Sequence, residues 1–222
     1  MLDRTERSRQ ENLLEEAIQE YKTQPHTPEL VTKTWERLWQ VWGGGVNLNF
    51  IVPACNRPQE KLVELENLPE PRMMIYCPDK IATPEGLFLL GEIFPHMESW
   101  SLEKGARVIN EVNVGGWYDI EARIEAPYTG TTEDGLRKLF ASQGRTGQRL
   151  ATYIIGAQFS FLITGHYFDD SRSRQSRLLG SRCWDRVLYA RFHWSGRLIV
   201  FADLLPQFHD SLTGGRSEVL VG

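Results

Sequence analysis

The apolar positions near the start of the chain recur at the spacing of an amphipathic helix, and glutamates occupy the opposite face. The apolar stripe consists of Leu13, Leu14, Ala17, Ile18 and Tyr21. This pattern predicts a helix over residues 3–22. Thr27 is a favourable N-cap followed by a proline, so a second helix is expected to run to about Trp42 and to end at the glycines 43–45. Two antiparallel helices joined by a short turn are the simplest arrangement.

The second predicted helix carries three tryptophans, Trp35, Trp39 and Trp42, at the spacing i, i+4, i+7. Residues at this spacing share one helix face. A tryptophan stripe of this kind usually belongs to a core, so we expect the face to be buried against a sheet or a second subunit. An exposed tryptophan would instead indicate a partner surface.

After residue 45 the pattern changes to short strands and helices. Strands are expected at 46–52, 73–76, 106–112, 151–155, 158–164, 186–194 and 198–202, with Ser195-Gly196 as a hairpin turn between the last two. Helices are expected at 87–94, at 118–126, from Thr131 to about Gln143, and as a short turn within the polar segment 53–71. The order predicts an α+β fold: an N-terminal helical hairpin, residues 1–45, then a mixed β-sheet with flanking helices, residues 46–222.

Composition narrows the class of protein. The 222 residues are 41% hydrophobic and 24% charged, which is typical of a globular domain. Three well-separated cysteines disfavour a disulfide framework and a cysteine-rich zinc site, and they fit a reducing cytoplasm. The charged N-terminus does not resemble a secretory signal, and no apolar run approaches the length needed to span a membrane.

The net charge of −4 hides an asymmetry along the chain. Residues 1–136 hold 13 basic and 23 acidic residues, whereas residues 137–197 hold 11 basic and 3 acidic ones, and ten of the basic residues are arginine. The preferred interpretation is that these arginines pair with the acidic part of the same chain; the alternative is a surface that faces an anion, since guanidinium groups bind carboxylate and phosphate in bidentate fashion. The candidate anion-binding residues are Arg172, Arg174, Arg177, Arg182 and Arg186. The first three lie in the Arg/Ser-rich stretch 171–177, for which a solvated loop between two strands is the preferred interpretation.

A motif in the C-terminal half reads Gly180-Ser181-Arg182-Cys183-Trp184-Asp185-Arg186. Together with the expected strand at 106–112 and the segment 131–136, it resembles a family of bacterial proteins of unknown function over residues 106–216. That family carries a glycine where this chain has Trp184. The resemblance implies an α+β unit with a shared structural motif and implies no catalytic residue.

Two clusters have the residue types of catalytic groups. Arg182 and Arg186 flank Cys183 and would favour a reactive thiolate, which needs a base such as His166 or His193. The segment 166–170 offers an imidazole and two carboxylates, His166, Asp169 and Asp170, but lacks a recognised metal-ligand spacing. For both clusters a structural role is the preferred interpretation, and no catalytic residue, metal or cofactor is predicted.

These observations favour a non-enzymatic binding or accessory module whose partner is a protein or a small anionic ligand. An enzyme that uses Cys183 or the His166/Asp169/Asp170 cluster is the first alternative. Nucleic-acid binding through the arginines of 137–197 is the second, and it is disfavoured because the acidic segment 1–136 would repel a long polyanion.

Overall fold

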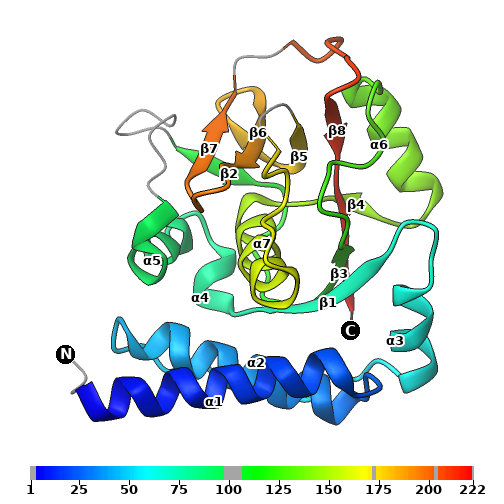
Figure 1. Ribbon diagram of the computed structural model, residues 1–222. Helices are drawn as coiled ribbons and strands as arrows, with labels where there is room; N and C mark the ends of the chain where they lie inside the picture. Colours follow the sequence, from blue (N-terminus) through cyan, green and yellow to red (C-terminus); the bar gives the residue numbers. More distant parts are fainter. Residues whose placement is uncertain (1–3, 98–106, 172–173, 203–204, 222) are drawn as a thin grey trace.

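The chain folds into helices and sheets, which confirms the predicted α+β class, as the computed structural model shows for residues 4–97, 107–171, 174–202 and 205–221 (Figure 1). The helices are α1 (Arg4–Thr23), α2 (Pro28–Gly44), α3 (Gln59–Glu66), α4 (Asp79–Ala82), α5 (Gly86–Ile93), the short η1 (Pro95–Met97), α6 (Glu133–Ser142) and α7 (Leu150–Thr164). The strands are β1 (Arg72–Cys77), β2 (Val108–Asn110), β3 (Gly116–Glu121), β4 (Thr146–Gly147), β5 (Gln175–Cys183), β6 (Arg186–Phe192), β7 (Leu198–Phe201), β8 (Thr213–Gly215) and β9 (Ser217–Val221).

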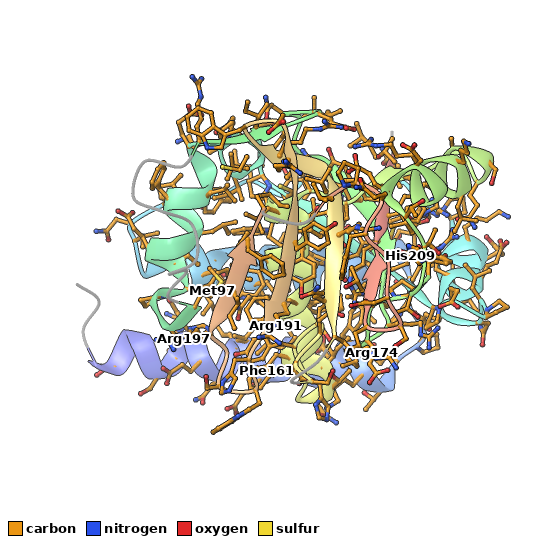
Figure 2. All side chains as sticks on the ribbon, turned by 90° about the horizontal axis from the view of Figure 1, so that it is seen from above. Met97, Phe161, Arg174, Arg191, Arg197 and His209 are labelled. Carbon is orange, nitrogen blue, oxygen red and sulfur yellow. The ribbon has the colours of Figure 1, made fainter. Side chains whose placement is uncertain are left out.

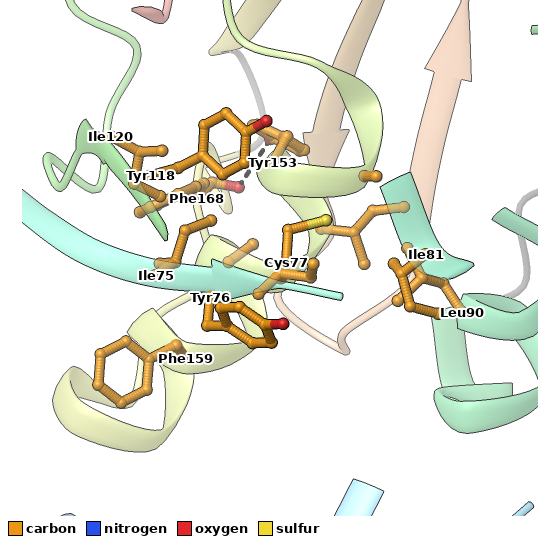
Figure 3. Packing of buried hydrophobic residues seen from close by; sticks show 14 of the residues in the cluster. Ile75, Tyr76, Cys77, Ile81, Leu90, Tyr118, Ile120, Tyr153, Phe159 and Phe168 are labelled. Carbon is orange, nitrogen blue, oxygen red and sulfur yellow. Dashed lines mark hydrogen bonds between the residues drawn. The ribbon is translucent and has the colours of Figure 1, made fainter. Parts of the chain in front are cut away.

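Among the described residues the strands form two sheets. The first has the order β1-β3-β9-β4, and the second has the order β2-β5-β6-β7 with β8 paired in parallel to β5. Helix α7 runs through the middle of the molecule, with α1 and α2 below β1 and α6 beside β8 (Figure 1). Side chains from α7, β1 and β3 meet in one apolar cluster, in which the Tyr153 hydroxyl donates to the Phe168 carbonyl (Figure 3).

The central helix α7 corrects the strands expected at 151–155 and 158–164. Every residue from Leu150 to Ser160 is buried. A helix that is buried on all sides shows no 3.6-residue alternation of apolar and polar positions, so its sequence resembles a pair of buried strands. Gly165 ends the helix in a left-handed conformation, which is the usual place for a glycine after a helix.

The N-terminal helices form the expected hairpin, and Thr27 caps α2 by accepting a hydrogen bond from the Leu30 amide. Trp35 and Trp39 are buried against the sheet, while Trp42 is partly buried. The two indole nitrogens donate to β1 carbonyls, Trp35 Nε1 to Met74 O at 3.2 Å and Trp39 Nε1 to Tyr76 O at 3.0 Å. Four helical residues rise about 6.0 Å and two strand residues about 6.6 Å, so the i, i+4 indoles match alternate carbonyls of the strand. Helix α2 therefore covers the edge of the first sheet.

Two further predictions were wrong. Residues 46–52 form no strand, because the amides of Val46 and Leu48 bond to the Gly43 carbonyl and continue the end of α2 as a turn. The helix expected at 118–126 is replaced by strand β3, in which Trp117 to Glu121 are all buried. A strand buried on both faces lacks the period-2 alternation that identifies a half-exposed strand.

Other expected elements are confirmed, with bounds that differ by a few residues from those predicted. Strands β1, β2, β6 and β7 and helices α3 and α5 lie within or close to their predicted ranges. Helix α6 begins at Glu133, two residues later than expected, because Thr132 is the N-cap and its hydroxyl accepts a hydrogen bond from the Gly135 amide. The Arg/Ser-rich stretch 171–177, interpreted from the sequence as a solvated loop, enters strand β5 at Gln175.

Candidate functional site

Several paired charged groups in the described structure are buried in the core. Three consecutive residues before and within the C-terminal strand, Arg216, Ser217 and Glu218, are all buried. Arg216 Nη2 lies 3.2 Å from Asp169 Oδ1, and Arg149 Nε lies 2.7 Å from Glu218 Oε1. These contacts fix the C-terminal strand to the rest of the fold.

Asp169 is the centre of the first of these contacts. Its Oδ2 accepts hydrogen bonds from the Ser176 hydroxyl at 2.6 Å and the Tyr153 hydroxyl at 3.0 Å, in addition to the ion pair with Arg216. Burial, and after it the neighbouring Asp169 carboxylate, raises the pKa of Tyr153 well above its ordinary value. Tyr153 therefore stays a neutral donor, and the aspartate is held as the acceptor of a closed network.

Glu218 fills the N-terminal end of α7. Its carboxylate accepts from the Arg149 amide at 3.4 Å and from the Thr152 hydroxyl, while the Ser181 hydroxyl accepts from the Leu150 amide at 2.9 Å. The positive end of a helix attracts anions. Here one of the chain's own carboxylates occupies that position, which argues against an anion site at this helix end.

A third buried group joins β3 to β9. Arg145 Nη1 donates to Asp119 Oδ1 at 2.9 Å, and its Nε donates to the Ser217 hydroxyl at 2.5 Å. The Ser217 amide and hydroxyl donate to Glu121, at 2.6 and 2.8 Å. Burial raises the pKa of Glu121, and the hydrogen bonds from Ser217 oppose that shift. The order of residues along the chain does not reveal this network, because it does not distinguish a buried arginine or glutamate from a solvated one.

The structure places the candidate anion-binding arginines in different environments. Arg172 lies outside the described residues. Arg174, at the surface end of β5, lies 3.3 Å from Glu125 (Figure 2). Arg177 is buried within β5, where it donates to the Tyr189 hydroxyl and the Thr131 carbonyl, both at 2.6 Å. Arg177 is thus a structural residue, and its expected place in a solvated Arg/Ser-rich loop is corrected.

The other two candidates lie near the β5–β6 turn. Arg182 Nη2 is 3.8 Å from both Glu111 and Glu133, and Arg186 Nε is 3.8 Å from Asp185. Glu111, Glu125 and Glu133 all belong to the acidic segment 1–136. The described contacts therefore favour internal charge pairing for Arg174 and Arg182 over a shared anion site.

The residues of the thiol hypothesis lie apart. Cys183 is at one end of β5, and Ser176 near the other end contacts Asp169. Ser176 pairs with Ala190 and Cys183 with Arg186, which lie four residues apart on β6, so Cys183 is separated by about 13 Å from the strand position that contacts the segment with His166. His193 lies just beyond the far end of β6, whose first residue pairs with Cys183. Neither histidine is placed to act as its base.

Cys183 is buried, with 5% of the residue exposed, and Cys55 and Cys77 are buried as well. Burial raises the pKa of Cys77 to about 12. We expect Cys183 in the native protein to react slowly with an aromatic disulfide reagent at neutral pH, whereas unfolded chain reacts at all three cysteines. Absorbance of the released thiolate measures this. A rapid stoichiometric phase that Cys183→Ser removes would contradict it and restore the thiol hypothesis.

The acidic-histidine cluster is divided by the fold. His166 Nδ1 lies 3.1 Å from Asp170 Oδ2 at the surface, whereas Asp169 points into the core. Within the described residues, no three histidine, cysteine or acidic side chains are grouped so that they could hold a metal ion. Asp169 therefore belongs to the buried network with Arg216, and His166 and Asp170 form a separate pair.

The segment 180–186 has two parts. Gly180 lies so close to the chain that leads into α7 that a Cβ there would be 2.4 Å from the Gly147 carbonyl oxygen. Ser181, besides capping α7, donates to Asn110 Oδ1 at 2.7 Å. These residues join β5 to the start of α7 and to β2, so the first part of the motif is structural.

The second part is the turn itself. Cys183 pairs with Arg186, so Trp184 and Asp185 form a two-residue hairpin turn. Trp184 has φ of 57° and is 79% exposed. It is the first central residue, which is usually glycine in a type II′ turn because a left-handed φ crowds any Cβ. The resembled motif carries a glycine at the position of Trp184. The backbone of Trp184 has the positive φ that glycine adopts easily.

No protein-family model matches the chain, and no curated protein or solved structure was found to be similar to it. Among the helices that the structure describes, none combines the length and the apolar character required to cross a bilayer.

Proposed function

We propose that the protein is a non-enzymatic binding module that docks a protein partner through the tip of the β5–β6 hairpin, with Trp184 as the anchor. Two features of Trp184 contribute nothing favourable to the free energy of folding. A left-handed φ costs a non-glycine residue about 1–2 kcal/mol, and the indole gains little burial because it is 79% exposed. Strained and exposed residues concentrate where a protein contacts other molecules.

The alternatives have less support in the geometry. Cys183 lies away from both histidines, and Asp169 is buried away from the contact between His166 and Asp170. Arg177 is buried in the core, and Arg174 pairs with Glu125. Tryptophan is among the residues most enriched at the energetic centres of protein interfaces. A two-residue turn also restricts the backbone that carries the ring, which lowers the entropy lost on binding.

The strain at Trp184 predicts an effect on the free energy of unfolding that does not depend on a partner. Trp184→Gly should raise the free energy of unfolding by about 1 kcal/mol, because glycine adopts the left-handed backbone without a Cβ clash. Trp184→Ala keeps the Cβ and should leave stability almost unchanged. Urea unfolding of both variants measures this. A loss of stability in Trp184→Gly would show that the indole supports the fold, and the docking role would lose its basis.

The docking role is tested with a photo-crosslinking amino acid at position 184, with position 194 as the matched control because Trp194 is also exposed, at 65%. A protein captured only from position 184 is then purified and titrated. Its Kd should weaken about 30-fold or more with Trp184→Ala, as is typical of an interface hot spot, and should stay the same with Trp194→Ala. Equal affinity for wild type and Trp184→Ala would refute the proposal.

A further inference from the structure

The surface around the tip is built from the ends of three strands. Val108 of β2 and Arg186 of β6 both pair with Cys183 of β5. One step beyond Val108 and Cys183, Arg107 and Trp184 are therefore neighbours at the end of the strand pair. Ile109 pairs with Arg182. We call Arg107, Ile109, Arg182, Trp184 and Arg186 the tip surface.

The tip surface has the outward-facing side chains of β2 and β5. Along β2, Val108 and Asn110 are buried whereas Arg107 and Ile109 are exposed, the latter at 50%. Alternate residues of a strand point to opposite faces, so Arg107 and Ile109 lie on the outer face of the second sheet. The surface thus combines two exposed apolar side chains with guanidinium groups.

The charged side chains at and near the tip surface fall into two groups, one with and one without enough oppositely charged neighbours among the described residues. Glu111 and Glu133 lie within 3.8 Å of both Arg137 and Arg182, so these four groups offset one another. Arg107 and Arg186 flank the turn at the ends of β2 and β6, and among the described residues one ion pair is found for them: Arg186 Nε lies 3.8 Å from Asp185, whose side chain is 87% solvent-exposed. Counting the described residues of the tip surface and its turn, the strand ends that flank Trp184 therefore carry an excess of positive charge, although the whole chain has a net charge of −4.

We infer that the partner presents an acidic apolar segment: a hydrophobic pocket or peptide that takes the Trp184 indole, with carboxylates that reach Arg107 and Arg186. This inference rests on the proposed docking role and specifies the chemistry of the partner. Guanidinium groups pair with carboxylates in bidentate fashion, and such rim charges set the rate and the selectivity of association. A basic partner would meet Arg107 and Arg186 as like charges.

A phage-displayed library of random peptides tests the inference without knowledge of the natural partner. Peptides are selected on the full-length protein and depleted on Trp184→Gly, which keeps the fold and lacks the indole. The enriched sequences should combine aromatic or aliphatic residues with Asp and Glu and carry net negative charge. Neutral or basic enriched sequences would overturn the acidic partner while leaving the docking role intact. The absence of any Trp184-dependent peptide would overturn both.

Charge reversal tests the same inference on the protein side. Arg107→Glu/Arg186→Glu should weaken the selected peptides about tenfold or more, and raising the salt from about 50 to about 200 mM should weaken wild-type binding. The control, Lys33→Glu/Lys61→Glu, changes the net charge equally on α2 and α3 and should change affinity little. Equal effects of the two double variants would refute a local role for the arginines.

A duplex DNA of mixed sequence serves as the competing probe. We expect no binding that depends on Arg107 and Arg186, because the rest of the chain is acidic. Salt-sensitive duplex binding that Arg107→Glu/Arg186→Glu abolishes would overturn the inference and assign the tip surface to nucleic acid.

Discussion

Asp169→Asn should lower the free energy of unfolding by about 3 kcal/mol, because it leaves the buried Arg216 guanidinium without a counter-charge. Asn has the shape of Asp and tolerates the left-handed backbone at this position, where φ is 54°. The change therefore tests the charge and not the local geometry. Urea or thermal unfolding followed by circular dichroism measures it.

Asp170→Asn is the matched control. Asp170 pairs with His166 at the surface, and exposed ion pairs are worth about 0–1 kcal/mol. The double variant Asp169→Asn/Arg216→Met should be less destabilised than the sum of its single variants, because removing the second charge relieves the first defect. A cost below about 1 kcal/mol for Asp169→Asn would mean that water reaches this pair.

Trp39→Ala should destabilise the protein by about 3–5 kcal/mol, the range for a large aromatic residue removed from a core. Two contributions combine: the lost packing against Trp42 and Phe50, whose ring centroids lie 5.3 and 4.8 Å away, and the lost donor to the Tyr76 carbonyl. A large fall in melting temperature is the expected result.

Two variants separate these contributions. Trp39→Phe keeps most of the apolar volume and loses the indole N–H, so it should cost much less than Trp39→Ala, about 1–2 kcal/mol. Trp194→Ala removes an exposed indole and should change stability by no more than about 0.5 kcal/mol. An unchanged melting curve for Trp39→Ala would mean that α2 is not anchored on β1 in solution.

Local patterns in the sequence, apolar stripes and helix caps, were enough to predict several helices. The stripe of α1 and the Thr27-Pro28 start of α2 are local signals, and both helices form where these signals indicate. The burial of Trp35 and Trp39 also follows from spacing alone. These features depend on residues that lie within a few positions of one another, which is why sequence reasoning reaches them.

Elements at the centre of the fold were not predictable in this way. Helix α7 and strand β3 are covered on all sides, so neither shows the alternation that reveals a helix or a strand. Their conformation is decided by what covers them, the two sheets for α7 and the neighbours β1 and β9 for β3. Information of that kind comes from residues far away along the chain.

The residues of the candidate site show the same difference between local signals and information from distant segments. Residue types and order alone drew attention to the segment 180–186 and to the charge asymmetry of the chain. Only the tertiary structure decided that Asp169 and Arg216 meet across 47 positions in the core, that Arg177 is buried, and that Trp184 projects into solvent. Charged side chains read alike from sequence whether solvated or buried, because their environment is supplied by distant segments that folding brings against them.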